Sequence, residues 1–349
     1  MFPNAYASGI TTSNLQPQAI KSMLLLNRSE LQQILTEESV IEAVECGFRA
    51  HQKGETISPL RMHVDLKETS GIYLLMPSFH NSGSAFGSKI LSLYAANPTK
   101  NKPTISSMYL LCDGEDGSFQ AIMDGGCITG MRTAAASAVA SKYLARPDAK
   151  VQGIIGTGTQ AMFQAAAIAT ACPCERLIVY NLHRDKAVQF AEKAAVRLGI
   201  PVDVAASVGE VGQQADIITT VTSSITPVLN LSDVRPGCHI NAVGAFKPRM
   251  QEIGADLIKA ARVVVDSLEA CLAETGDLLV PINNGSYSAE EIHGELGDLL
   301  LGNISGRGSD DEITLFESVG ISFEDLVTAQ LACTRARERN IGSEIDLTL

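Results

Sequence analysis

A glycine-rich turn gives the clearest chemical signal in this sequence. Gly156, Gly158 and Ala161 form the pattern G-x-G-x-x-A directly after the apolar run 151–155, and a helical pattern follows at 162–171. In this pattern the first glycine makes a tight turn, the second lets the backbone approach a pyrophosphate, and the alanine allows close packing of the helix on the strand. The free amides at the helix start would face the phosphates. The turn therefore predicts dinucleotide binding, with a purely structural glycine turn as the alternative.

The end of the next expected strand indicates which dinucleotide binds. The strand at 176–180 runs into Asn181, His183 and Arg184, with no acid at its tip to accept the ribose hydroxyls of NAD. An uncharged Asn181 beside two basic side chains could accommodate a 2′-phosphate. The sequence therefore favours NADP(H), with NAD(H) as the alternative. Arg184 could instead be a solvated residue of the first helical turn, and Asp185 could be a poor ribose ligand.

The second half of the chain must form the sheet that carries this turn. From Lys150 onward strand patterns alternate with helical ones, as in a parallel sheet built from βαβ units. An Ala-rich segment at 129–145 precedes them and is predicted as one long helix, whose small residues permit close packing. These patterns predict a doubly wound α/β domain of the Rossmann type. The expected strands cover residues 151–155, 176–180, 202–205, 217–221, 239–243 and 262–266.

The first half of the chain has a different pattern. Apolar residues first recur at helical spacing, and the period then shortens toward two. A Gly-rich turn at 113–117 predicts a hairpin. We therefore expect an α+β unit, preceded by a weakly ordered polar arm over residues 1–24. Its expected elements are helices from about residue 27 and over 38–51, and strands over 72–76, 85–90, 106–111 and 119–123.

Composition and charge exclude several classes of partner. Hydrophobic residues make up 45% and charged residues 19%, which is typical of a globular chain. The 27 basic residues against 39 acidic ones give a formal charge of −12, which disfavours nucleic acid and anionic membranes. The apolar runs are far shorter than the ~20 residues of a membrane span, and no basic and apolar leader opens the sequence. We expect a cytoplasmic protein.

The cysteines do not form a metal or disulfide framework. The 8 cysteines are scattered, with mostly apolar neighbours and no C-x-x-C pair. The nearest pair, Cys172 and Cys174, lacks a second pair or a nearby histidine for tetrahedral zinc. We therefore predict buried reduced thiols and no metal site.

Several further motifs resemble those of the ornithine cyclodeaminase and mu-crystallin family. They are Gly-Ser-Lys-Ile at 87–90, Gly-Met-Arg-Thr-Ala-Ala-Ala at 130–136, Asn-Ala-Val-Gly at 241–244 and Phe-Glu-Ser-Val-Gly at 316–320, with a closing helix from Phe323. The resemblance spans nearly the whole chain. It implies a substrate-binding and dimerisation domain formed by residues 1–130 together with 320–349, a NAD(P)-binding Rossmann domain at 131–319, and a homodimer.

The resemblance also implies chemistry at a carbon that bears both nitrogen and carboxylate. Substrate carboxylate recognition in the family maps onto Arg61, Lys89 and Arg132, and a substrate-pocket threonine onto Thr104. A guanidinium can grip a carboxylate through two hydrogen bonds, and cations are scarce in this chain. We assign catalytic roles to Lys89 and Arg132. The cofactor contacts expected in addition to the glycine turn, Asn181, His183 and Arg184 are Thr133, Thr159, Gln160, Thr222, Val243, Gly244 and Ser318.

One departure from the family pattern selects the reaction. In the cyclodeaminases Asn-Ala-Val-Gly continues into Gly-Asp, and that Asp exchanges protons with the substrate amine. Here Ala245 and Phe246 follow, and Met250 stands where the cyclodeaminases have a lysine. Phe246 cannot transfer a proton, which argues against ornithine deamination. The Ala-Phe-x-Pro version of this segment resembles the ketimine reductases of the family.

The resulting hypothesis is an NAD(P)H-dependent reductase of cyclic imino acids. It would convert Δ1-pyrroline-2-carboxylate or Δ1-piperideine-2-carboxylate into L-proline or L-pipecolate. The nitrogen proton could come from a pre-protonated iminium, from water or from Lys89. The ring size stays open, because one methylene changes binding by only roughly 1–3 kcal/mol. The alternatives are an amino-acid or opine-type dehydrogenase, a true cyclodeaminase, and a non-enzymatic NADP-dependent small-molecule binder.

Overall fold

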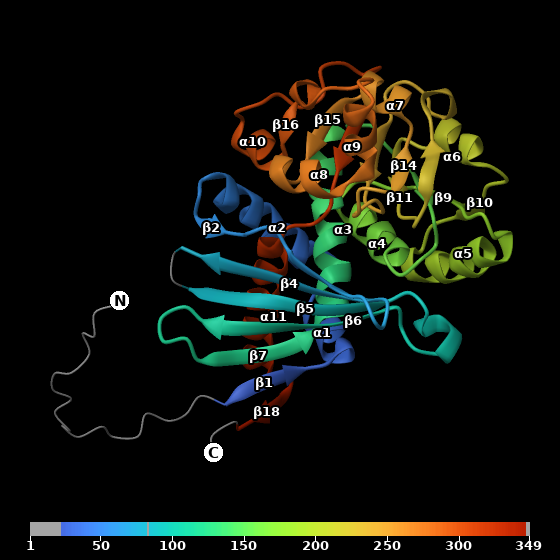
Figure 1. Ribbon diagram of the computed structural model, residues 1–349. Coiled ribbons are helices and arrows are strands. Elements are labelled where there is room, and N and C mark those ends of the chain that lie inside the picture. The colour runs from blue at the N-terminus through green and yellow to red at the C-terminus, as the bar shows by residue number, and fades with distance from the viewer. Residues whose placement is uncertain (1–21, 82–83, 347–349) are drawn as a thin grey trace, which may run out of the picture.

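The computed structural model describes residues 22–81 and 84–346, and it contains two large sheets joined through helices (Figure 1). One sheet is built from the two ends of the described chain and the other from its middle. They correspond to the expected α+β unit and to the expected Rossmann-type unit, so the predicted fold class is confirmed. No helix within the described residues is long and apolar enough to cross a membrane.

The first sheet has the strand order β18-β1-β7-β6-β5-β4-β2, and β3 also pairs with β4. Its pairs are antiparallel, except that β1 runs parallel to β7. The strands are β1 (Met23–Leu26), β2 (Thr56–Ile57), β3 (Met62–Leu66), β4 (Gly71–His80), β5 (Ala85–Tyr94), β6 (Ile105–Asp113), β7 (Phe119–Asp124) and β18 (Ser343–Ile345).

The prediction of a weakly ordered arm over residues 1–24 is wrong for its last residues. Met23 and Leu24 belong to β1 and are buried between β7 and β18. Both neighbouring strands come from distant parts of the sequence, so no local pattern announces this pairing. Residues 1–21 of the expected arm lie outside the described residues.

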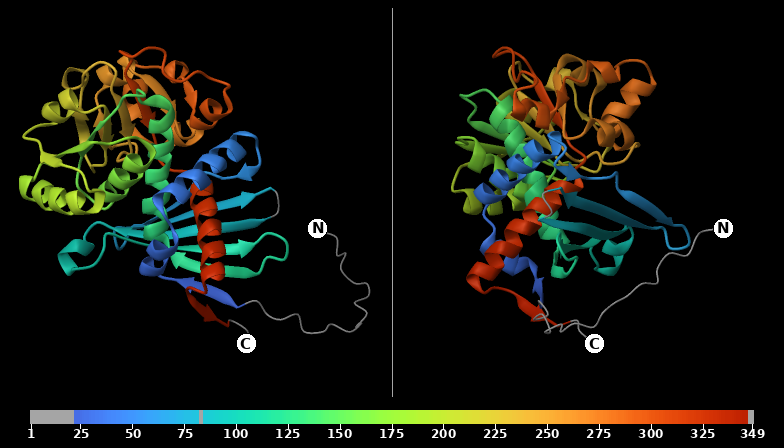
Figure 2. Two further views of the ribbon diagram at one scale, coloured as in Figure 1. Left: turned by 180° about the vertical axis from the view of Figure 1, so that it is seen from behind. Right: turned by 90° about the vertical axis from the view of Figure 1, so that its left-hand side faces the viewer.

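Helices cover one face of the first sheet and leave its other face without a helix in the described chain (Figure 2). In β6, Tyr109 and Leu111 point to the helices and are buried, whereas Met108 points to the other face and is 47% exposed. The helix α3 begins earlier than the expected residue 129, because Asp124 Oδ1 accepts the backbone N–H of Cys127 at 2.6 Å and caps the helix. The four helices are α1 (Arg28–Ile34), α2 (Glu37–Gln52), α3 (Gly125–Leu144) and α11 (Ser322–Arg339).

The second sheet is parallel throughout, in the order β10-β9-β8-β11-β13-β17-β15-β16. Its first five positions reproduce the 3-2-1-4-5 order of dinucleotide-binding folds. The late strand β17 inserts between β13 and β15, which the sequence did not predict. The strands are β8 (Val151–Ile155), β9 (Arg176–Tyr180), β10 (Val202–Val204), β11 (Ile217–Thr220), β13 (His239–Ala242), β15 (Arg262–Val265), β16 (Gly294–Glu295) and β17 (Thr314–Glu317).

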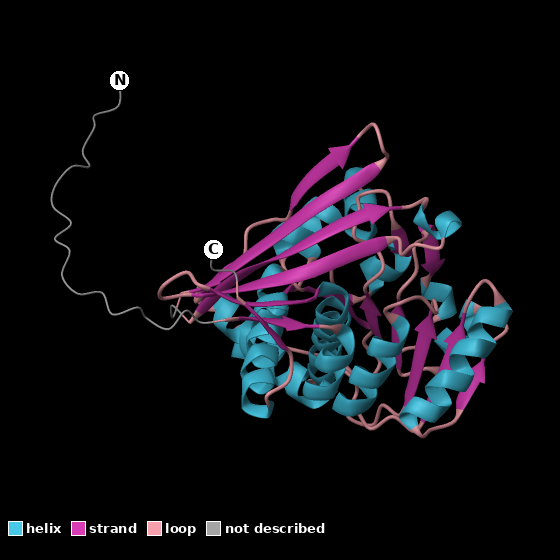
Figure 3. Cartoon of the chain, turned by 90° about the horizontal axis from the view of Figure 1, so that it is seen from below, coloured by secondary structure: helices cyan, strands magenta, loops and turns pink. Residues whose placement is uncertain are grey.

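Helices pack on both faces of this second sheet (Figure 3). In β8, Ile154 contacts the first turns of α4, whereas the neighbouring Gly153 faces Val211 of α6. Successive strand residues point to opposite faces, so the sheet is doubly wound as predicted. The remaining elements are α4 (Ala161–Ala171), α5 (Arg184–Leu198), α6 (Val208–Gln214), α7 (Ala255–Ala260), α8 (Leu268–Glu274), α9 (Gly276–Asn283), α10 (Leu296–Leu301), the strand pair β12 (Ile225–Leu229) and β14 (Gln251–Ile253), and the 3₁₀ turns η1 (Asn97–Lys100), η2 (Leu231–Asp233) and η3 (Ala289–Glu291).

The helix α3 joins the two sheets into one body. It packs against α2 and α11 on the side of the first sheet, and against α4, β13 and β17 on the side of the second. Eight of its residues are alanine, glycine or serine between positions 130 and 141, which lets these neighbours approach closely. One apolar cluster therefore runs from β1 and α1 through α3 to Phe316 of β17.

Candidate functional site

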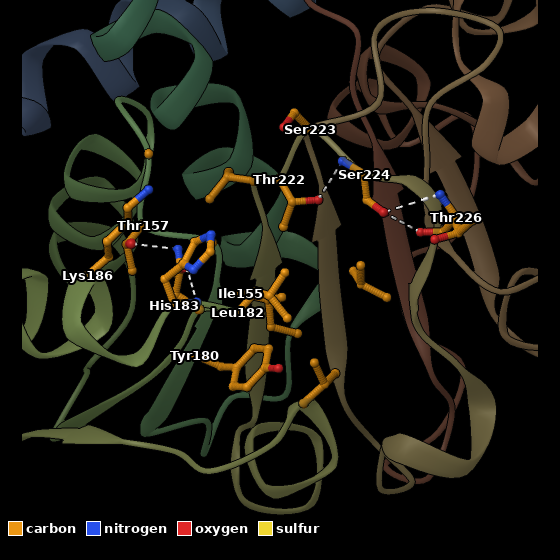
Figure 4. A pocket seen from close by; sticks show the side chains of 16 residues that line it. Ile155, Thr157, Tyr180, Leu182, His183, Lys186, Thr222, Ser223, Ser224 and Thr226 are labelled. Atoms are coloured by element: carbon orange, nitrogen blue, oxygen red, sulfur yellow. Dashed lines mark hydrogen bonds between the residues drawn. The ribbon is translucent and has the colours of Figure 1, made fainter. Parts of the chain in front are cut away.

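A cleft of about 730 Å³ opens at the carboxyl ends of β8, β9 and β11 (Figure 4). The glycine turn forms its floor. Gly156 has a φ of +102°, and a Cβ there would lie 2.8 Å from the carbonyl oxygen of Val221. A Cβ on Gly158 would meet nothing within 4 Å, so this face of the turn is open to a ligand. The two glycines thus fit the roles expected for a tight turn and for the approach of a pyrophosphate.

The side chains at the end of β9 are held in place by the turn. Asn181 Nδ2 donates to Thr157 Oγ1 at 2.7 Å, and the backbone N–H of His183 donates to Asn181 Oδ1 at 2.9 Å. Asn181 and His183 both line the cleft, as expected of cofactor-binding residues. Arg184 is exposed and does not line it; the cation of the first α5 turn that does is Lys186 (Figure 4).

The other expected cofactor residues are distributed along the carboxyl edge of the sheet. Thr222 lines the cleft, Val243 and Gly244 directly follow β13, and Ser318 directly follows β17. Ala161 begins α4, and Gln160 at its N-cap has a buried side-chain oxygen without a hydrogen-bond partner in the described residues.

Of the 13 expected cofactor residues, five line the cleft and eight do not. Two of these eight lie in other parts of the fold. Thr133 is buried within α3, and Thr159 lines a separate groove of about 550 Å³ between α3 and α4. The structure does not bring either side chain among the residues that line the cofactor cleft.

A second set of charged residues is buried where β5, α3 and α11 meet. Lys89 Nζ lies 2.8 and 3.0 Å from the two carboxylate oxygens of Asp325. Arg132 Nε donates to Asp325 at 3.2 Å, and its Nη1 donates to Glu324 at 2.9 Å. Lys89 is 1% exposed and Arg132 4%. The two predicted catalytic cations are therefore together and share one carboxylate.

Arg61 joins this set through the turn that follows β17. Its Nη2 donates to the carbonyl oxygens of Val319 and Gly320 at 2.8 and 3.0 Å, and it forms an ion pair with Glu274 at 2.8 Å. Gly320 has a φ of +82°, and a Cβ there would lie 2.1 Å from Arg132 Nη1. Both guanidinium groups thus contact the turn that begins beside Ser318, at the edge of the cofactor sheet.

Burial shifts the pKa values of Lys89 and Glu324. Burial and the nearby Arg132 lower the pKa of the Lys89 ammonium to about 8. Burial raises the pKa of Glu324 to about 7, against the opposing effect of Arg132. The Lys89 ammonium can therefore lose its proton close to neutral pH, which is a property of catalytic lysines.

Sequence reasoning missed the acidic members of this set, Glu274, Glu324 and Asp325. Each follows its cation by more than 190 positions, and nothing local marks a counter-ion at that separation. The Glu-Asp pair at the start of the closing helix was the available signal. It was ambiguous, because the helix dipole also favours two acids in a first helical turn.

Thr104 is not brought to these cations. The backbone N–H of Tyr94 donates to its carbonyl oxygen at 2.8 Å, so Thr104 lies at the far end of the β5–β6 hairpin. In β5, Tyr94 is five positions beyond Lys89, which is about 17 Å along an antiparallel strand. Its role in the substrate pocket stays a prediction.

The loop after β13 carries the departure noted in the sequence. Phe246 is partly buried, with Lys247 Nζ at 5.6 Å from its ring centroid, and Met250 is buried. Neither Phe246 nor Met250 has a titratable group. Within the described residues no group of His, Cys, Asp and Glu side chains is arranged to hold a metal, and the cysteines are all free thiols.

Comparisons with known proteins agree with this architecture. The Δ1-pyrroline-2-carboxylate reductase of Bacillus cereus is 39% identical over 325 residues, which cover 93% of this chain and 100% of that protein. The structure of Thermococcus litoralis Δ1-pyrroline-2-carboxylate reductase with NADH and L-proline has a TM-score of 0.90 and 38% identity, and covers 93% of this chain and 100% of its own. An archaeal alanine dehydrogenase dimer with bound NAD has a TM-score of 0.88 and 32% identity, over 94% and 100% of the two chains.

The family model described as ornithine cyclodeaminase/mu-crystallin matches residues 21–340. The match includes the glycine turn, the cations Arg61, Lys89 and Arg132, and the closing helix α11. It confirms the resemblance inferred from the motifs. The chain therefore belongs to the ornithine cyclodeaminase/mu-crystallin family.

Proposed function

We propose that this protein reduces cyclic imino acids with a nicotinamide cofactor. The substrates would be Δ1-pyrroline-2-carboxylate and Δ1-piperideine-2-carboxylate, and the products L-proline and L-pipecolate. The observation that carries the proposal is the contact of Arg61 and Arg132 with the turn beside Ser318, because it joins a carboxylate-binding set to the cofactor edge of the sheet. The similarity to two Δ1-pyrroline-2-carboxylate reductases supports it.

The chain's own residues would bind and orient the imine. Arg132 and Arg61 offer guanidinium donors for the ring carboxylate, and the buried site strengthens these charge-assisted hydrogen bonds. When bound, NAD(P)H supplies the hydride for the imine carbon. Lys89 carries a proton on Nζ whose pKa of about 8 allows transfer to the nitrogen near neutral pH. An iminium that arrives already protonated would need only the positioning.

The cleft supports NADPH as the preferred donor. Asn181 stands at the end of β9, and the cleft is lined there by His183 and Lys186 rather than by an acid. Such cations suit a 2′-phosphate, whereas an acid would suit the free hydroxyls of NAD. NADH is the alternative donor, and the similar reductase of Thermococcus litoralis was solved with NADH.

A second candidate function is an amino-acid dehydrogenase. The archaeal alanine dehydrogenase dimer shares the fold at 32% identity. The same cations would hold an open-chain oxo acid as well as a cyclic imine. A cyclodeaminase is disfavoured, because Phe246 supplies no proton carrier next to Gly244.

The test is NADPH and NADH oxidation, measured separately with pyrroline-2-carboxylate, with piperideine-2-carboxylate, and with pyruvate plus ammonia. We expect turnover of at least one cyclic imine, with NADPH as the better donor. No turnover of either imine would overturn the proposal, and faster turnover of pyruvate plus ammonia would favour the dehydrogenase. A tenfold preference for NADH would refute the assignment of the cations near Asn181.

We further propose that the helix-free face of the first sheet forms a homodimer. Met62, Leu75, Ile90 and Met108 lie in register across β3, β4, β5 and β6 on that face. Met62 is 58% exposed and Met108 47%, so the row is an apolar patch of the kind that marks an interface. The archaeal alanine dehydrogenase of similar fold is a dimer.

The proposed domains are residues 1–130 with 320–349 for substrate binding and dimerisation, and 131–319 for the cofactor. This division would place Lys89 and Asp325 in one unit and the glycine turn in the other. We also propose a cytoplasmic location, which free thiols suit because the cytosol is reducing.

A further inference from the structure

A buried carboxylate joins two loops at the carboxyl edge of the second sheet. Glu252 of β14 is fully buried. Its Oε2 accepts the hydroxyl of Thr220 at 2.9 Å and the backbone N–H of Gly244 at 2.7 Å, and its Oε1 accepts the backbone N–H of Thr222. One side chain thus joins the end of β11 to the loop after β13.

The sheet order places these loops at the nicotinamide half of the site. A dinucleotide bound across a 3-2-1-4-5 sheet has its adenosine half over the first βαβ unit, here β8 and β9. Its other half would then lie over β11 and the strands that follow it in the sheet, β13 and β17. Thr222 follows β11 and lines the cleft, and Gly244 follows β13. Glu252 contacts both loops and does not itself line the cleft.

These contacts need a carboxyl group that presents one acceptor oxygen to each loop. Two of its partners are backbone N–H groups, which can only donate, and a glutamine amide would turn a donor toward one of them. The fit is also tight, since a Cβ on Gly244 would lie 2.5 Å from Glu252 Oε2 and 2.3 Å from the carbonyl oxygen of Thr222. Burial raises the pKa of Glu252, and the hydrogen bonds from Thr222, Thr220 and Gly244 oppose that rise.

A second buried acid holds Glu252 itself. Asp277 Oδ1 accepts the backbone N–H groups of Glu252 and Ile253 at 2.7 and 2.9 Å. Asp277 belongs to α9, so this helix fixes the strand β14 from which Glu252 reaches the two loops. The position of the carboxylate is therefore set by packing on both sides.

We propose that Glu252 is a positioning residue for the nicotinamide half of the cofactor. Its carboxylate fixes the backbones of Thr222 and Gly244 at the spacing that the nicotinamide riboside requires, without itself contacting the cofactor. The inference rests on the proposed use of NADPH.

The test compares two ligands on the variant Glu252→Gln. NADPH binding is measured by nicotinamide fluorescence, and binding of 2′-phospho-ADP-ribose, which lacks the nicotinamide, by calorimetry. We expect the Kd of NADPH to rise at least tenfold and that of the fragment to change less than twofold. Equal weakening of both ligands, or an unchanged NADPH Kd, would overturn the proposal.

The matched control is Glu312→Gln. Glu312 also accepts a backbone N–H, from Gly308 at 2.6 Å, but it precedes β17 at the opposite edge of the sheet. We expect both Kd values to stay within twofold of the unaltered protein. If Glu252→Gln does not fold, Glu252→Asp is judged by the same two ligands, because it keeps the charge but is one methylene too short to reach both loops. If the unaltered protein binds only NADH, the same comparison is made with NADH and ADP-ribose. If it binds neither NADPH nor NADH, the proposed function itself is refuted.

Discussion

Lys89 is the residue whose surroundings decide most about the proposed chemistry. It lies between an acid that stabilises its charge, Asp325, and a cation that opposes it, Arg132. Because burial has the largest effect, its pKa falls to about 8 instead of rising. A lysine in this state can both attract a carboxylate and donate a proton, and both roles require the ammonium form.

The reductase activity should decrease above pH 8 if Lys89 must be protonated. Its pKa is lowered to about 8, so the ammonium is present below that pH and is lost above it. We expect kcat/KM for the imine to fall about tenfold per pH unit on the alkaline side. Lys89→Arg, which stays protonated, should abolish this alkaline limb while it lowers the maximal rate. A limb that persists in Lys89→Arg would assign it to another group.

Arg132 should act on the substrate and not on the cofactor. Truncation of one partner of a buried charge pair costs about 2–5 kcal/mol, so Arg132→Ala should raise the imine KM roughly 30-fold or more, or abolish turnover. NADPH affinity, measured by fluorescence, should stay within twofold. Arg132→Lys controls for the loss of charge opposite Glu324 and Asp325. An equal loss of NADPH affinity in Arg132→Ala would move this residue to the cofactor site.

At the scale of elements, the turn between β8 and α4 contains two glycines, Gly156 and Gly158, that are needed for different reasons. Gly156 adopts a backbone conformation that favours glycine, and it packs against the carbonyl of Val221. Gly158 has open space on its Cβ side. The same turn therefore contains one glycine that the fold needs and one whose open side leaves room for a ligand.

Alanine at these two positions should give opposite results. Gly156→Ala should lower the Tm by at least about 3 °C, because a positive φ costs an alanine roughly 1–2 kcal/mol and the carbonyl contact adds to it. Gly158→Ala should leave the Tm unchanged within about 1 °C but raise the NADPH Kd at least tenfold, since the methyl group would occupy the phosphate face. Calorimetry and fluorescence titration measure the two quantities. A destabilised Gly158→Ala would show that this face is not open in solution.

At the scale of the whole molecule, the uncovered face of the first sheet should decide the oligomeric state. Met108→Lys together with Met62→Lys places two charges in the apolar row that crosses β3 to β6. We expect sedimentation velocity to show a dimer for the unaltered protein and a monomer for this double variant. Val196→Lys is the control, because Val196 is 88% exposed but lies on α5 of the other sheet. Dissociation caused by Val196→Lys, or a dimer that survives the double variant, would place the interface elsewhere.

The sequence by itself determined the features that are encoded locally. The glycine turn, the six strands around it and the long helix before them follow from period, turn residues and small side chains. Each of these six strands ends within one residue of its expected end, whereas β4 and β5 each run four residues beyond theirs. The order of the motifs was sufficient to identify the family. The motifs also pointed to Lys89 and Arg132, which contact the same carboxylate in the structure. The loss of a proton carrier at Phe246 was likewise visible without a structure.

Only the tertiary structure decided how the charges are paired and which cation lines the cleft. Asp325 meets Lys89, Glu274 meets Arg61 and Glu252 meets Gly244 because helices and strands distant in sequence pack together. Lys186 lines the cleft in place of Arg184 because the direction of α5 determines which side of its first turn faces β8. Hydrophobic period and turn chemistry act over a few residues, whereas a buried charge is stabilised by whichever partner the packing brings within hydrogen-bond distance.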